Sequence, residues 1–224
     1  MNTQIIKQLI LKDWYFQRWM LSAYISGCFI TLFGVIWGQD IVRTISASLF
    51  VMAVMSLSMY LIFTTVINER KQGNLSFVMS LPITVKDYTI AKMVANAAAF
   101  VIPWSVLFTI AIYAIATLDF LAAGWVPIIS ITLVYILVFY SVMLTVSLAF
   151  ESEGWTIFAM VAFFMTFTFA FMWVKGLDGI APYIQGDKIV WSSDALTVLA
   201  AELLSIVGML GLTFFFQSRK TDFL

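Results

Sequence analysis

The stretch NERKQGNLSFVMSLPITVKDYTIAK, residues 68–92, is a polar island in an otherwise apolar chain. It lies between two long apolar runs, residues 44–67 and 93–118. A helix that crosses a bilayer needs about 20 predominantly apolar residues, and both runs reach that length. We therefore expect the island to lie in water and to connect two membrane-spanning helices.

The first part of the island predicts the end of one helix and the start of another. Glu69, Arg70 and Lys71 continue the preceding apolar run with charged residues. Gly73 suits the left-handed conformation that often closes a helix. Asn74 can cap the next helix by accepting a hydrogen bond from a backbone N–H that has no partner within the helix.

A short amphipathic helix is predicted in the middle of the island. Leu75, Val78 and Met79 are spaced at i, i+3 and i+4, which places them on one helical face. Pro82 ends this helix, because the residue before a proline disfavours the helical conformation. Thr84 followed by Asp87 resembles a capping box, which starts the next helix. We expect the short helix to lie across the membrane surface.

The island resembles the cytoplasmic loop of the ABC-2 type permeases, the membrane subunits of ATP-binding-cassette exporters. The resemblance is carried by Glu69, Arg70, Gly73, Asn74-Leu75, the run Ser80-Leu81-Pro82-Ile83, and Lys92. More loosely, Leu9 and Leu11-Lys12-Asp13 resemble the segment before the first span in small bacterial members. The alternative is that any cytoplasmic loop needs caps, a proline and charges.

The resemblance implies a role for the island and a set of partners. In that family the loop carries a coupling helix that docks on an ATPase. On this chain the docking residues would be Glu69, Arg70, Gly73, Asn74, Leu75, Val78, Met79, Leu81 and Pro82. The resemblance further implies two ATPase subunits per complex, which bind ATP and Mg, and a second permease subunit that makes a homodimer or heterodimer. The implied cargo is an apolar or amphipathic peptide, lipid or drug, exported across the bacterial cytoplasmic membrane.

Composition independently indicates a membrane protein. Of 224 residues, 62% are hydrophobic and 11% are charged, whereas a soluble domain carries about 25% charged residues. Lys and Arg together equal Asp and Glu at 12 each, so there is no basic excess to neutralise the phosphates of nucleic acid. The chain has no His and one Cys, Cys28, which makes a disulfide framework or a His- or Cys-based metal site implausible.

The sequence lacks the motifs of an ATPase and the residue sets of a hydrolase with a nucleophilic Ser or Cys. No G-x-x-x-x-G-K-[S/T] loop is present to hold ATP phosphates. Without histidine, neither a Ser-His-Asp nor a Cys-His set can form. We therefore expect a non-catalytic subunit with no cofactor of its own. The alternatives are a membrane scaffold or immunity protein without transport, and an ATP-independent carrier, for which broken, repeated helices would be expected.

Six apolar runs of spanning length predict a single all-α permease domain over residues 1–224. The predicted spans are residues 19–37, 44–67, 93–118, 125–150, 155–174 and 195–216. In residues 1–18, Ile6, Ile10 and Trp14 recur every four residues, with basic residues interspersed. This spacing predicts an amphipathic helix at the lipid interface; the alternative is a frayed tail. With both termini inside, most basic residues outside the spans lie on the cytoplasmic side, and only Arg43, Lys175 and Lys188 lie outside, as the positive-inside rule requires.

Small residues in the first span predict a close helix contact. Gly27, Gly34 and Gly38 lie near one stripe of the helix, and Gly34 and Gly38 form a small-xxx-small pair. Such stripes let two helices approach closely, either within a chain or between subunits. A chance distribution of small residues is the alternative.

Four residues in the later spans are candidates for a translocation path or gate. Pro103 removes a backbone hydrogen bond and is expected to bend the third span, although prolines are common in membrane helices. Phe163 and Phe167 lie on an aromatic stripe that can accommodate apolar cargo or simply face lipid. Glu202 is a lone carboxylate well inside the last span, where an ionisable group usually faces protein or a water-filled cavity. We expect it to line an outer vestibule or to pair with Lys175 or Lys188.

The turn after the fourth span carries two acidic residues, Glu151 and Glu153. By family resemblance this inner turn would be a second contact with the ATPase. On physical grounds alone, Glu153-Gly154 would form a tight turn that the acidic side chains keep in water.

Overall fold

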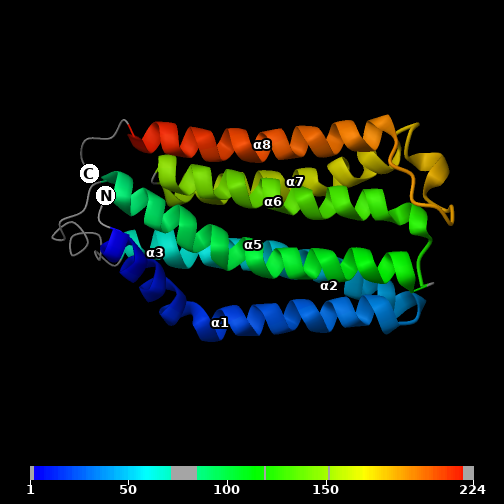
Figure 1. Cartoon of the computed structure of the whole chain (residues 1–224), viewed down its shortest axis with the longest axis horizontal. Coiled ribbons are helices and arrows are strands. Elements are labelled where there is room, and N and C mark those ends of the chain that lie inside the picture. The colour runs from blue at the N-terminus through cyan, green and yellow to red at the C-terminus, as the bar shows by residue number, and fades with distance from the viewer. Residues whose placement is uncertain (1–2, 72–84, 119, 151, 219–224) are drawn as a thin grey trace.

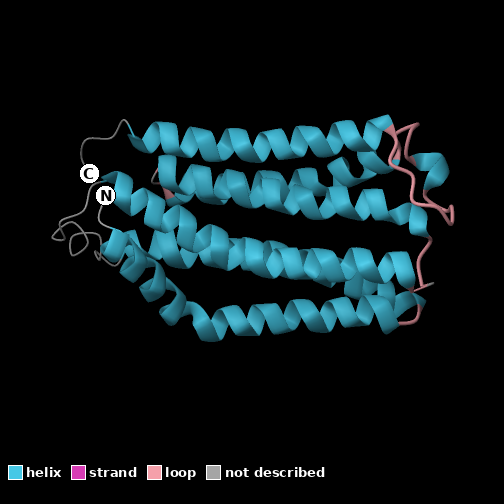
Figure 2. Cartoon of the chain, in the orientation of Figure 1, coloured by secondary structure: helices cyan, strands magenta, loops and turns pink. Residues whose placement is uncertain are grey.

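The computed structural model describes residues 3–71, 85–118, 120–150 and 152–218, and all regular structure in these ranges is helical (Figure 2). This confirms the predicted all-α fold. The predicted short helix of the polar island lies outside the described residues, and so do Gly73, Asn74, Leu75, Val78, Met79, Leu81, Pro82 and Glu151.

Six helices within the described ranges are long and apolar enough to cross a membrane, as predicted. In chain order the elements are α1 (Thr3–Trp37), α2 (Asp40–Ile62), the π-helix η1 (Phe63–Ile67), α3 (Asn68–Lys71), α5 (Val85–Thr117), the short helix η2 (Ala123–Trp125), α6 (Val126–Ala149), α7 (Glu153–Lys175), the short helix η3 (Ala181–Tyr183) and α8 (Ser193–Ser218). The chain is therefore a multi-pass membrane protein.

The long helices lie side by side in one bundle, and both ends of the chain lie at the same end of it (Figure 1). We call this the terminal end; it also holds α3 and the start of α5. The opposite, distal end carries the connections from α1 to α2, from α5 to η2 and from α7 to α8. This arrangement follows from an even number of spans joined by short connections.

Helix α6 forms the centre of the bundle. In its most apolar window 72% of the residues are buried, against 6% for both α7 and α8. Helix α6 packs against α2, α5, α7 and α8, and its Tyr140 ring stacks on Phe100 of α5 with centroids 4.4 Å apart. Helices α7 and α8 consequently leave most of their surface available to lipid or to another subunit.

Helix α1 is continuous from Thr3 to Trp37. The segment 1–18, predicted as a separate interfacial helix, therefore runs directly into the first span without a break. Figure 1 shows that α1 changes direction along its length, so that its first part leans toward the start of α5. Helix α5 likewise continues through Pro103.

The three predicted packing glycines differ in their surroundings. Gly34 lies against Ser46 of α2, and a Cβ added at Gly34 would collide with the Ser46 Oγ. The N–H of Gly38 donates to the Gly34 carbonyl at 3.0 Å, at the end of α1. A Cβ at Gly27 would meet nothing within 4 Å. The close approach of α1 to α2 therefore depends on Gly34, whereas Gly27 makes no close contact within this chain.

The connection from α7 to α8 folds back over the distal end. The N–H of Gly124 donates to the Gly186 carbonyl at 2.9 Å, and the Asp194 carboxylate accepts from the Gly179 N–H at 3.0 Å. A small apolar cluster beneath this connection consists of Ile128, Ile131, Val174, Ile180, Ile184 and Ala195. These contacts tie the ends of α6, α7 and α8 together.

Candidate functional site

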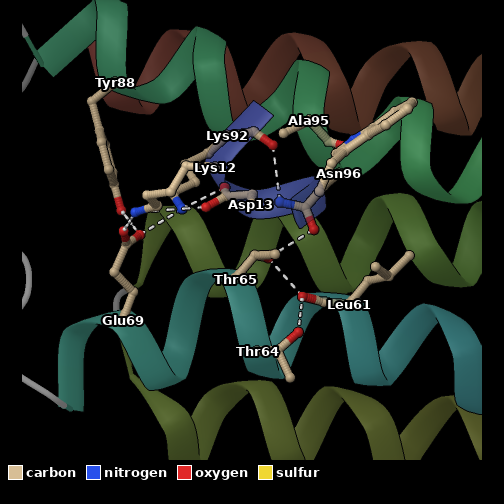
Figure 3. Close-up of polar contacts among 11 residues, drawn as sticks. Lys12, Asp13, Leu61, Thr64, Thr65, Glu69, Tyr88, Lys92, Ala95 and Asn96 are labelled. Carbon is tan, nitrogen blue, oxygen red and sulfur yellow. Dashed lines mark hydrogen bonds and ion pairs between the residues drawn. The ribbon is translucent and has the colours of Figure 1, made fainter. Parts of the chain in front are cut away.

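A buried cluster of charged side chains lies at the terminal end of the bundle, where α1, α3 and α5 meet (Figure 3). Lys92 of α5 is its centre and is only 1% exposed. The Lys92 Nζ lies 2.7 Å from the Asp13 Oδ2 of α1 and 2.6 Å from the Glu69 Oε2 of α3. One ammonium group thus joins three helices that are far apart in the sequence.

Two further side chains complete the cluster. The Lys12 Nζ donates to the Glu69 Oε1 at 2.9 Å and lies 3.7 Å from the Asp13 Oδ1. The Tyr88 hydroxyl donates to the Glu69 Oε2 at 3.1 Å. The cluster, defined as Lys12, Asp13, Glu69, Tyr88 and Lys92, therefore contains two cations and two carboxylates, so its formal charge is balanced.

Charge balance explains why the bundle tolerates this cluster. An isolated charge in a low-dielectric interior is very costly, and it persists only when it is paired and hydrogen-bonded. Removal of one partner from a buried ion pair leaves the other charge uncompensated, which destabilises a protein strongly. The relative positions of α1, α3 and α5 are consequently tied to one another through Lys92.

A chain of hydrogen bonds extends the cluster toward α2. The Asn96 amide donates to the Lys92 carbonyl at 2.9 Å, and the Thr65 hydroxyl lies 2.7 Å from the Asn96 Oδ1 and 2.6 Å from the Leu61 carbonyl (Figure 3). Thr65 belongs to the π-helix η1, which connects α2 to α3. Single π-helical turns inside longer helices are rare and frequently occur at functional sites.

The cluster also changes the acidity of Glu69. Burial favours the neutral form and by itself would raise the pKa, but the ion pairs and hydrogen bonds with Lys92 and Lys12 outweigh it and lower the pKa of Glu69 below its ordinary value of 4.5. Glu69 is 6% exposed. Its carboxylate is therefore held ionised by its neighbours, although it has almost no contact with solvent.

The burial of Glu69 differs from the expectation that it continues the preceding helix into water. Its carboxylate is turned into the bundle because Lys92 and Lys12 lie there. Arg70 lies in α3. The next residue, Lys71, pairs with Glu153 of α7 at 2.7 Å, and the two side chains are 56% and 39% exposed. Glu153 is thus brought next to the start of the polar island.

Glu153-Gly154 is not the tight turn that one interpretation predicted. Both residues belong to the first turn of α7, and the Ser152 side chain caps this helix by accepting from the Trp155 N–H. Ser is a favoured capping residue, and an acidic residue in the first turn interacts favourably with the helix dipole. The helix therefore begins two residues before the predicted start of the span.

The candidate gate residues do not form one site. Phe163, Phe167 and Glu202 line a groove of about 450 Å³ between α6, α7 and α8, whereas Pro103 lies in α5. Among the described residues, no ion pair joins Glu202 to Lys175 or Lys188, and the Glu202 Oε2 is buried without a hydrogen-bond partner. Lys175 instead lies over the Trp125 ring, 5.4 Å from its centroid.

Sequence reasoning missed most of the cluster. Lys92 was expected to lie in water at the start of a span. Lys12 and Asp13 were noted only as part of a loose family resemblance. The sequence does contain one sign of the cluster. Asn96 follows Lys92 by four residues, so two polar side chains lie on one face at the start of an apolar helix. Buried polar residues in such a helix call for partners.

The arrangement holds three helices together through ion pairs. Its charged groups pair with one another. Within the described ranges, no three or more His, Cys, Asp or Glu side chains come together in a way that could hold a metal ion. The cluster is suited to couple the segment between α3 and α5 to helix α1.

Comparison with known proteins identifies the family. Residues 8–221 match the family described as ABC-2 family transporter protein. No curated protein and no solved structure matches the chain. Membrane proteins of this family work in general with ABC ATPase partners and are typically the non-catalytic component. Since the match covers nearly the whole chain and the six apolar helices agree with it, this protein belongs to the ABC-2 transporter family and is a membrane permease.

Proposed function

We propose that this chain is the permease subunit of an ABC exporter and that a separate ATPase drives it. Each complex contains two ATPase subunits and two permease subunits, which are identical or related. ATP and Mg are bound by the ATPase. The cargo is an apolar or amphipathic molecule such as a peptide, a lipid or a drug.

The observation that carries this proposal is the burial of Lys92 between Asp13 and Glu69. Glu69 and Lys92 lie on the two helices that flank the polar island, α3 and α5, and Asp13 lies on α1. A push on residues 72–84 by an ATPase would move α3 and α5, and the ion pairs would carry this movement to α1. The Lys71–Glu153 pair would extend it to α7.

The orientation of the bundle supports this coupling. Lys7, Lys12, Lys71 and Lys92 belong to helix segments at the terminal end, and the positive-inside rule therefore favours a cytoplasmic terminal end. Both termini and the polar island are then on the side where ATP is available. We place the protein in the bacterial cytoplasmic membrane with both termini inside.

Transport in vesicles tests the proposal directly. The full chain is reconstituted with candidate ABC ATPases, and cargo movement is measured with ATP and with a non-hydrolysable analogue. We expect movement only with ATP and only with the ATPase present. Movement without an ATPase would identify an ATP-independent carrier, and partner sequestration without movement would identify a scaffold or immunity protein.

A second experiment tests the predicted docking helix. Replacement of Leu75, Val78 and Met79 by Asp places charge on its predicted apolar face, and we expect the ATPase to be lost from the purified complex. Asp at Leu11, which is exposed on α1, is the control. Normal ATPase recovery with the triple variant would contradict the docking assignment.

A further inference from the structure

The groove between α7 and α8 combines an apolar lining with one carboxylate, that of Glu202. Helix α6 packs against both α7 and α8 and forms the floor of the groove. The lining is mostly aromatic and aliphatic and includes Tyr135 on the floor and Phe163, Phe167 and Trp173 on the α7 wall. The volume of about 450 Å³ lies within the range of small-molecule sites, roughly 300–1,000 Å³.

Glu202 introduces a carboxylate into this apolar lining. It lies on α8 roughly 13 Å along the helix from Ser193, at 1.5 Å per residue, which places it well inside the hydrocarbon region. Its Oε2 is buried and has no hydrogen-bond partner. Among the described residues that line the groove, none is a lysine or arginine. This contrasts with the charge-balanced cluster at the terminal end.

A negative charge on Glu202 would gain from a cationic partner, and the described groove lining supplies no lysine or arginine. Polar and ionisable groups within a membrane are costly unless they are paired, and they commonly mark a substrate path. A lipid tail would fill the groove but would leave the carboxylate unpaired. A cationic group would pair with Glu202, while the aromatic walls would contribute cation–π contacts and cover an attached apolar chain.

We propose that this groove binds a cationic amphiphile, with its amine or ammonium group at Glu202 and its apolar part between α7 and α8. The polar side chains near Glu202 are consistent with an amine headgroup. The Tyr135 hydroxyl lies 3.2 Å from the Thr166 Oγ1, and Ser205 lies one helical turn beyond Ala201 on the same wall. This inference rests on the proposed function only in that it names the class of cargo.

The probe is dodecylamine that carries a diazirine on its alkyl chain, and the matched neutral probe ends in a hydroxyl group. The purified full chain is placed in nanodiscs of zwitterionic phosphatidylcholine, illuminated with each probe, and digested for mass spectrometry. We expect the amine probe to label residues of α7 and α8 that line the groove. Excess unlabelled dodecyltrimethylammonium should compete for this labelling.

The decisive comparison is between Glu202→Gln and Glu153→Gln. Glu202→Gln keeps the size of the side chain but removes its charge, and we expect groove labelling by the amine probe to fall about tenfold, the size of one lost charge-assisted contact. Glu153→Gln lies at the terminal end and should leave labelling unchanged. A second variant, Ala201→Phe, should block the groove sterically, whereas Leu204→Phe, 72% exposed, should not.

Several results would overturn the proposal. Equal labelling of the groove by the amine and hydroxyl probes, or equal labelling of wild type and Glu202→Gln, would show that lipid-like apolar chains fill it without recognition of charge. Absence of labelling together with disulfide-linked dimers of a Cys28→Ser, Ala201→Cys variant would show that a second copy of the chain covers the groove. The experiment contains no ATPase, so its outcome is independent of whether transport requires ATP.

Discussion

Lys92 shows how one side chain can join distant parts of the chain. It is 1% exposed, and both its ion-pair partners are nearly as buried. Its Nζ also lies 5.8 Å from the centroid of the Tyr88 ring. The free energy of these interactions comes from pairing rather than from solvation, so the loss of a single charge should have a large effect.

We expect Lys92→Met to destabilise the bundle by about 3–5 kcal/mol, because it leaves the two buried carboxylates, Asp13 and Glu69, with only the partly exposed Lys12 as a cationic partner. The matched control is Lys71→Met, which breaks an exposed pair with Glu153 and should cost no more than about 1 kcal/mol. Thermal unfolding in detergent, followed by aggregation or by reactivity of Cys28, measures both. A similar loss of stability in the two variants would show that the buried ion pairs of Lys92 contribute no more than the exposed pair of Lys71.

The lowered pKa of Glu69 predicts a pH dependence of stability. Because the pKa of Glu69 in the folded chain lies below the ordinary value of 4.5, the unfolded chain takes up a proton first as the pH falls. The stabilisation by ionised Glu69 is therefore complete above the ordinary value and is lost as the pH falls through the lowered folded pKa.

Melting temperatures measured from pH 7 down to about pH 3 test this dependence. Glu69→Gln should be less stable than wild type at neutral pH and should lose less stability as the pH falls. Glu153→Gln, which changes a carboxylate outside the cluster, is the matched comparison. A wild-type slope in Glu69→Gln would assign the acid sensitivity to other groups.

At the scale of elements, the helices meet closely in two places that glycine makes possible. Gly34 allows α1 to approach α2, and Gly124 allows η2 to approach the connection between α7 and α8. At Gly124 the obstacle to a larger side chain is the Tyr183 carbonyl oxygen. Backbone cannot move aside as readily as the end of a side chain.

Gly124→Ala should therefore destabilise the distal end by about 1–3 kcal/mol, the usual cost of overpacking. Gly208→Ala in α8 is the control, because a Cβ there meets nothing within 4 Å; it should be neutral or stabilising by up to about 1 kcal/mol. Thermal unfolding compares the two, and limited proteolysis of the segment 176–192 locates the effect. Equal melting temperatures would show that the distal contact is looser than the structure indicates.

The terminal end also depends on how elements are joined. The π-helix η1 connects α2 to α3 and contributes the Thr65 hydroxyl to Asn96 of α5. It thereby connects the polar side chains of α5 to the end of α2 and places Glu69 against Lys92. The sequence predicted that the helix of the second span continues into Glu69, Arg70 and Lys71, but it did not predict the π geometry of η1.

On the scale of the whole molecule, the bundle separates two kinds of region. The terminal end contains balanced charges that tie α1, α3 and α5 together. The groove between α7 and α8 contains a single carboxylate. Helix α6 lies between them and packs against both sides. In the proposed transporter, we expect movement of the terminal end to reach the groove through α6, because α6 contacts α5 as well as α7 and α8.

In the assembled transporter, Asp13→Asn should weaken this transmission. The variant keeps the size of the side chain but loses the negative charge that pairs with Lys92. We expect the amount of cargo transported per ATP hydrolysed to fall about tenfold, which corresponds to a typical coupling free energy between two sites. ATPase recovery with the complex should be unchanged, because Asp13 is buried and is not one of the proposed docking residues. Gln8→Asn, an exposed change on α1, is the control. An unchanged ratio would exclude the cluster from coupling.

The sequence by itself determined the class of fold and the six spans. Runs of about 20 apolar residues must be helical in a bilayer, because every backbone group has to find its hydrogen bond within the segment. This requirement is local, so it can be read from Thr44 to Ile67 or from Ala195 to Phe216 without knowledge of the rest.

Only the tertiary structure decided which polar residues meet. Lys92 and Asp13 are separated by 79 positions, and no local pattern specifies that they pair. Lys92 was expected in water because it borders an apolar run, yet the leaning first part of α1 brings Asp13 to it. The same reason applies to Glu202, whose predicted lysine partners lie elsewhere. Ion pairs form between helices according to packing, and packing depends on all six helices at once.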